Sequence, residues 1–206
     1  MDMFKDFVII IMTSVLVNNY VLSRFLGICP FLGVSKKTNQ AFGMGVAVIF
    51  VMMMATIVTW PIQKFVLETL KLEYLQTIVF ILVIAALVQL VEMILKKVLP
   101  SLHASLGIYL PLITTNCAVL AVCKNSLTED ILIKADTPQF LYAIVYAFAS
   151  GLGFLLAMVL FAGVRNRIAA SKPPKSFEGT PITLISASIV SLAFFGFGGI
   201  AENLFK

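Results

Sequence analysis

Charged side chains are scarce in this 206-residue sequence. Asp, Glu, Lys and Arg make up 12% of the chain, whereas 60% of it is hydrophobic. Soluble domains have about 25% charged and about 45–50% apolar residues. The shortage of charge therefore excludes a soluble globular domain and indicates an integral membrane protein. The net charge of +5 does not indicate nucleic-acid binding, because the basic residues lie between apolar runs, where they set membrane topology.

Histidine and cysteine are also scarce, and each shortage excludes a class of site. The single histidine, His103, excludes a bis-histidine haem within the chain and argues against a Ser-His-Asp triad. Three cysteines cannot form an even set of disulfides, and two of them lie in apolar stretches, which leaves metal binding or simple burial. The sequence also lacks a Walker A loop.

The apolar runs predict an all-α integral membrane protein in one membrane domain, with six transmembrane helices. A helix needs about 20 apolar residues to cross about 30 Å of hydrocarbon. We expect the second span to end at Trp60-Pro61, and the sixth to begin with Thr180 as the N-cap and Pro181 as the first helical residue. The first and fourth runs contain polar residues, glycine and proline, so both spans are predicted to be broken into half-helices. The expected spans cover about 3–34, 41–62, 75–95, 102–122, 139–164 and 181–201.

The two interrupted spans are related by an internal repeat. Residues 29–36 and 117–124 share Cys, Leu, Val and Lys at the same spacing. The repeat divides the chain into halves of about 1–100 and 101–206, each with three predicted spans. Because three is odd, the second half enters the membrane from the opposite side. Two inverted three-helix repeats form an architecture in which broken helices meet near the membrane midplane and build a site there.

The basic residues favour one orientation in the membrane. The loops after the first, third and fifth spans carry eight lysines and arginines, against six on the opposite side. Because cytoplasmic loops are enriched in Lys and Arg, both termini are predicted to lie outside the cytoplasm. The loop at residues 172–176 is then cytoplasmic.

Cys29 and Cys117 occupy equivalent positions in the two repeats and are the candidate metal ligands. Thiolate is a soft ligand that suits iron–sulfur clusters, zinc or copper. The alternative is that both cysteines are small apolar packing residues. Two thiolates cannot complete a cluster that needs four protein ligands, so metal binding predicts an interface with another chain. Cys123 is interpreted as structural.

Two further features of the interrupted spans are the depth of the cysteines and the roles of the polar residues near them. Lys36 and Lys124 each follow a cysteine by seven residues, or about 10 Å of helix. With both lysines at opposite interfaces, the cysteines remain about 10 Å apart in depth. Arg24 either compensates an anionic cluster or extends towards a headgroup. Capping of half-helices is expected, rather than lining of a path, for Asn18, Asn19, Thr114, Thr115 and Asn116.

Three stretches resemble a known family. They are residues 18–37, which include Cys29-Pro-Phe-Leu-Gly, residues 107–117, which end in Thr-Thr-Asn-Cys, and residues 177–188. They are similar to the A subunits of Rnf electron-transport complexes, and the likeness covers essentially the whole chain. The homologous E subunits of sodium-pumping NADH:quinone reductases are the alternative within the same family, but Cys29-Pro-Phe-Leu-Gly favours the Rnf side.

The resemblance implies a function that composition cannot show. It implies a component of a bacterial cell-membrane translocase, not an enzyme alone, that pairs with a homologous sister, the Rnf E subunit. The pair shares one [2Fe-2S] cluster, with Cys29 and Cys117 as the ligands from this chain. The complex moves electrons between ferredoxin and NAD and couples this to Na+ or H+ translocation. The D and G subunits carry flavins, and the B and C subunits carry the soluble redox centres.

Two other classes of function stay open from the residues themselves. One is a cofactor-free secondary transporter or channel whose broken helices bind a small solute. The other is a structural scaffold for redox partners. Iron content distinguishes both from an electron-transfer subunit.

Overall fold

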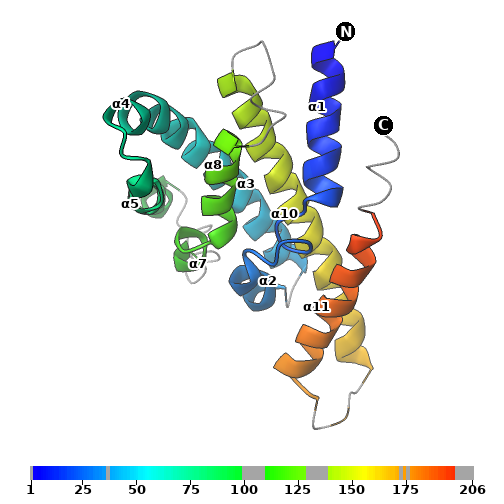
Figure 1. Ribbon diagram of the computed structural model, residues 1–206. Coiled ribbons are helices and arrows are strands. Elements are labelled where there is room, and N and C mark those ends of the chain that lie inside the picture. The colour runs from blue at the N-terminus through cyan, green and yellow to red at the C-terminus, as the bar shows by residue number, and fades with distance from the viewer. Residues whose placement is uncertain are drawn as a thin grey trace.

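The computed structural model describes most of the chain, and every regular element in the described part is a helix (Figure 1). Three helical segments are long and apolar enough to cross a membrane, namely Thr38–Leu67, Gln76–Met93 and Gln139–Ala170. The all-α membrane class is thus confirmed for the described part. His103, Lys36 and the loop at 172–176 lie wholly or mostly outside it. The described residues are 2–35, 38–98, 110–128, 139–171, 174 and 177–197.

Helix α10 (Gln139–Ala170) is the central element, and α3 (Thr38–Ile62) packs along it. Two glycines make this contact close. A Cβ atom on Gly45 would lie 3.1 Å from the Cα of Leu155, and a Cβ on Gly151 would lie 3.1 Å from the Cα of Ile49. Because transmembrane helices associate largely through van der Waals packing, small residues at such crossings stabilise the pair.

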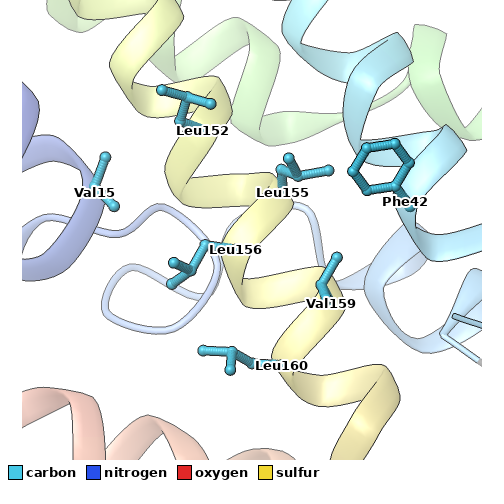
Figure 2. A pocket seen from close by; sticks show the side chains of 7 residues that line it. All are labelled: Val15, Phe42, Leu152, Leu155, Leu156, Val159 and Leu160. Atoms are coloured by element: carbon cyan, nitrogen blue, oxygen red, sulfur yellow. The ribbon is translucent and has the colours of Figure 1, made fainter.

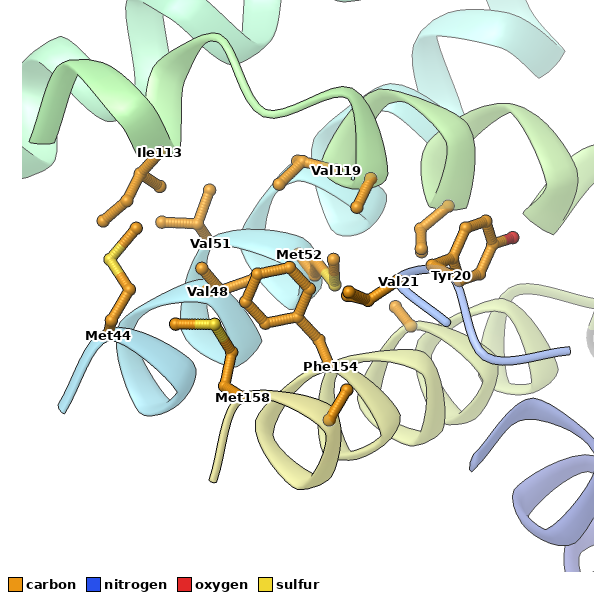
Figure 3. Packing of buried hydrophobic residues seen from close by; sticks show 14 of the residues in the cluster. Tyr20, Val21, Met44, Val48, Val51, Met52, Ile113, Val119, Phe154 and Met158 are labelled. Carbon is orange, nitrogen blue, oxygen red and sulfur yellow. The ribbon is translucent and has the colours of Figure 1, made fainter. Parts of the chain in front are cut away.

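The core lies between α10, α3 and α8 (Cys117–Thr128). Figure 3 shows Phe154 and Met158 of α10 directed towards Val48 and Met52 of α3, with Val119 of α8 on the other side. All five side chains are fully buried. The packing of these three helices forms the core of the described part of the chain.

Both spans that were predicted to be broken are interrupted in the structure. In the first, α1 (Asp2–Met12) continues as a π-helix (Thr13–Val17), and α2 (Ile28–Val34) begins after ten residues of irregular backbone. In the fourth, α7 (Leu110–Thr114) is followed by a short break and then by α8. The earlier residues of the fourth predicted span lie outside the described part.

The α-helix of the second span ends at Ile62, as predicted, but Trp60-Pro61 does not end the helical path. Pro61 lies inside α3, and the helical path continues through a π-helix (Gln63–Leu67) and α4 (Glu68–Leu70). Proline removes one backbone hydrogen bond and kinks a helix, but it does not have to end the helix. The turns that follow Pro61 adopt the wider π-helical pattern, and the chain stays helical as far as Leu70.

The sixth span also begins differently from the prediction. The N-cap of α11 (Thr180–Phe195) is Gly179, at φ 92°, with no side-chain capping bond. Glycine adopts positive φ at little cost, so the helix begins one residue earlier than a Thr180 cap would allow. The third predicted span corresponds to a 3₁₀ turn (Glu73–Leu75) and α5 (Gln76–Val98).

Candidate functional site

The two interruptions meet beside the middle of α10, where Gly27 of the first lies against Asn116 of the second and Phe154 of α10. From the first interruption, the Asn19 amide donates to the Gly153 carbonyl at 2.8 Å. At the end of that interruption, a Cβ on Gly27 would lie 2.9 Å from Cε2 of Phe154. Because α10 has 32 residues, it is about 48 Å long, and Gly153 and Phe154 lie at its midpoint. The interruptions therefore come together halfway along the longest helix.

Asn19 organises the first interruption. Its Oδ1 accepts hydrogen bonds from the backbone N–H groups of Val21 (3.0 Å) and Leu22 (3.2 Å). Its Nδ2 donates to the carbonyls of Val15 (3.1 Å) and Gly153. The side chain is fully buried. One amide thus bonds three backbone groups of the interrupted segment and one carbonyl of α10. Asn19 bonds the backbone of the interruption itself, whereas the N-cap of α2 is Gly27, so the prediction that Asn19 caps a half-helix is not confirmed.

Replacement of Asn19 by alanine is expected to destabilise the fold by about 3 kcal/mol, because an unsatisfied buried polar group costs about 1–3 kcal/mol and several would be created. The measurement is thermal unfolding of the purified protein in detergent. Asn18→Ala is the matched control, since its side chain makes no hydrogen bond in the described part of the chain and is only partly buried. Equal stability of the two variants would contradict the role of Asn19.

Asn116 caps the helix that follows the second interruption. It is buried, and its Oδ1 accepts a hydrogen bond from the Ala118 N–H at 3.0 Å, which caps the start of α8. Cys117 is therefore the first residue of a capped helix. The predicted capping role is confirmed for Asn116.

Gly27 joins the two interruptions. It is the N-cap of α2 and has φ 79°, a conformation that favours glycine. A Cβ at this position would lie 2.8 Å from the Oδ1 of Asn116 and 3.3 Å from the Cβ of Ala118. The absence of a side chain thus lets the N-terminal ends of α2 and α8 abut.

The three cysteines have different surroundings. Cys29 lies in the first turn of α2 and Cys117 in the first turn of α8, and both side chains are exposed. Cys123 is buried, and its sulfur lies 3.9 Å from Oγ1 of Thr56 on α3. The two candidate ligands are therefore at the ends of adjoining half-helices and open to a partner, while Cys123 is enclosed by the fold.

The donor set fits half of a metal site. Within the described ranges no three His, Cys, Asp or Glu side chains gather closely enough to hold a metal ion. A cluster with four cysteine ligands could take two thiolates, Cys29 and Cys117, from this chain and needs two more from outside. The exposure of both thiols is compatible with ligands that come from a second chain.

A polar network near the first interruption was not predicted. The hydroxyls of Tyr20 and Tyr146 lie 2.6 Å apart, and the Asn125 amide donates to Tyr20 at 2.9 Å. Tyr20 and Tyr146 are buried, and the Arg24 guanidinium lies 5.2 Å from the Tyr20 ring centre. Sequence gives no sign of this network, because its members are far apart in the chain. Both interpretations of Arg24 stay predictions.

Two hollows lie close to these elements. One, of about 140 Å³, lies between the first interruption, α2 and α11, and Ser188 and Ser191 of α11 are part of its lining. The other, of about 490 Å³, is lined only by apolar side chains of the π-helix Thr13–Val17, α3 and α10, among them Val15, Phe42 and Leu156 (Figure 2). The larger hollow offers no ligand atom for a metal, so the cysteine pair remains the candidate site.

Comparison with known proteins places the chain in a family. Residues 7–201 match the family described as "Rnf-Nqr subunit, membrane protein". A protein from Syntrophotalea carbinolica, named as the A subunit of an ion-translocating oxidoreductase complex, is 53% identical over 97% of this chain and 100% of its own length. A protein from Acetobacterium woodii, named as the A subunit of a Na(+)-translocating ferredoxin:NAD(+) oxidoreductase complex, is 53% identical over 94% of this chain and 97% of its own length. These matches confirm the resemblance seen in the sequence, and the chain belongs to the Rnf-Nqr family of membrane subunits.

Proposed function

We propose that this chain is the A subunit of an ion-translocating ferredoxin:NAD oxidoreductase complex in the membrane. We further propose that Cys29 and Cys117 bind a [2Fe-2S] cluster together with two cysteines of a homologous sister, the E subunit of the same complex. The names of its relatives support the first part. The observation that carries the second part is that both exposed cysteines lie in the first turns of half-helices whose ends abut.

The residues around the cysteines hold the two half-helices in place. Irregular backbone is tolerated at membrane depth only where protein or a cavity covers it. Asn19 and Asn116 satisfy the backbone groups of the two interruptions, and Gly27 brings the helix ends into contact. When bound, the cluster supplies one-electron transfer. The chain itself fixes the positions of two thiolates and leaves the other side of the site to the sister subunit.

Electrostatics offers a route from electron transfer to ion movement. Charges interact far more strongly in the membrane interior than in water. An additional negative charge near the membrane midplane would therefore lower the cost of bringing a Na+ or H+ ion close to it. In the proposed six-span inverted repeat, the interruptions in both halves would then alternate access between the two membrane faces.

The remaining subunits complete the proposed complex. The B, C, D and G subunits would carry the ferredoxin, NAD and flavin chemistry. For this chain we propose a single membrane domain over residues 1–206, located in the bacterial cell membrane. No nucleic acid is involved.

The direct test is to co-express this chain with its sister subunit, purify the pair without oxygen and measure iron, acid-labile sulfide and the EPR spectrum. The proposed function expects about two irons and two sulfides per pair and a signal from the reduced cluster. A pair without iron, together with solute uptake by this chain alone in liposomes, would instead support a cofactor-free transporter.

The proposed orientation has its own test. Ser171 is exposed just after α10, on the predicted cytoplasmic side. Thr69 is exposed in α4, just after the second span, on the predicted outer side. We expect a membrane-impermeant maleimide to label Ser171→Cys only from the cytoplasm and Thr69→Cys only from outside, with the parent chain as the blank. The reverse pattern would place both termini in the cytoplasm.

A further inference from the structure

The half-helix that carries Cys29 lies along one face of α10. The ring of Phe31 on α2 stacks on Phe161 of α10, with centroids 4.2 Å apart and an angle of 21° between the rings. Phe161 follows Phe154, which contacts the Gly27 end, by two helical turns, and Arg165 follows Phe161 by one turn. These three side chains therefore lie on the same face of α10.

Arg165 binds the opposite end of α2. Its Nη1 donates to the Leu32 carbonyl at 2.6 Å and to the Ser35 hydroxyl at 2.8 Å. The last four carbonyls of a helix have no partner inside the helix, and Leu32 is among them. A positive charge at a helix C-terminus is also favourable because of the helix dipole. Ser35, the C-cap residue, is fully buried.

This contact matters because α2 cannot hold its own position. It has seven residues, whereas isolated helices shorter than about 12–15 residues are marginal. The packing of Gly27 fixes its first turn and Arg165 fixes its last. Loss of either would let the helix tilt and would displace Cys29 relative to Cys117.

We propose that Arg165 is a positioning residue that anchors α2 and so sets the place of Cys29 in the shared metal site. The metal-site part of this inference rests on the proposed function. The sequence alone assigns Arg165 only to the positive charge of a cytoplasmic loop. Arg167, on the same helix end, is exposed and makes no hydrogen bond in the described part of the chain. It therefore provides a control that loses the same charge without losing the anchor.

The test compares Arg165→Gln with Arg167→Gln in the intact complex. Two quantities are measured: the hydrogen-exchange rate of the α2 amides, and the EPR g-values of the membrane cluster at equal iron content. Arg165→Gln is expected to speed exchange in α2 about tenfold or more, since hydrogen bonds to charged groups are among the stronger ones, and to shift the g-values. Arg167→Gln is expected to match the parent in exchange rate and in g-values. Arg165→Lys keeps the positive charge, so its changes should be smaller than those of Arg165→Gln.

Parent-like exchange and g-values in Arg165→Gln, or equal changes in both glutamine variants, would overturn the proposal. If Arg165→Gln does not accumulate, Ser35→Ala decides, because it removes one of the two acceptors. It should give a smaller change in the same direction, and no change would overturn the anchor. A parent complex without any cluster would contradict the proposed function. Unchanged exchange in α2 of Arg165→Gln would contradict only the positioning role of Arg165.

Discussion

Serine in place of Cys29 or Cys117 is expected to abolish the membrane cluster. A [2Fe-2S] cluster in this site would have four cysteine ligands, and a serine hydroxyl is a poor substitute for a soft thiolate. Either variant should lose at least nine-tenths of the cluster iron and acid-labile sulfide per complex, on the order of a tenfold change. It should also lose the EPR signal of the membrane cluster. Because both side chains are exposed, the fold itself should tolerate the change.

Cys123→Ser is the matched control, because it removes the one remaining cysteine of the chain. Cys123 packs against Thr56 between α8 and α3, away from the ends of the half-helices. We expect this variant to keep its cluster and to lose only a little stability. An unchanged membrane signal in both Cys29→Ser and Cys117→Ser would show that the cluster assignment is wrong. Equal loss in all three variants would indicate that the cysteines act through folding.

The interruptions could be predicted because their causes are local. Asn, Gly and Pro within an apolar run disrupt the regular helix, and a side chain such as that of Asn19 or Asn116 bonds to backbone groups only a few residues away. The same locality explains the errors. Local patterns predict that Trp60-Pro61 ends a span and that Thr180 caps a helix. In the structure the chain stays helical through Pro61, and Gly179 is the N-cap of α11.

The geometry of the site could not be predicted, because its contacts join distant parts of the chain. With Lys36 and Lys124 placed at opposite membrane interfaces, the predicted depths of Cys29 and Cys117 differ by about 10 Å. This depth estimate takes no account of helix tilt. It also takes no account of the contact of Gly27 with Asn116, which brings the ends of their helices together. The bond from Arg165 to Leu32 spans more than 130 positions and has no counterpart in any local pattern.

Replacement of Gly27 by alanine is expected to disrupt the site although every cysteine remains. A left-handed backbone costs a non-glycine residue about 1–2 kcal/mol. The new Cβ would also lie within 3 Å of Asn116 Oδ1 and Phe154 Cε2, and such overpacking costs about 1–3 kcal/mol. Relief of the contact with Asn116 requires α2 to move away from α8 or the Asn116 cap to shift. Either movement shifts Cys29 relative to Cys117, so cluster iron per complex should fall severalfold.

Gly33→Ala separates this effect from any general sensitivity of α2. Gly33 lies in the same short helix but is exposed, and a Cβ there would meet only Leu112 at 3.8 Å, an ordinary contact. Alanine is also favoured over glycine within a helix by about 0.5–1 kcal/mol. We therefore expect Gly33→Ala to keep its iron, sulfide and EPR signal. Parent-like cluster content in Gly27→Ala would mean that the abutting helix ends do not set the cysteine positions, and it would leave that role to the sister subunit.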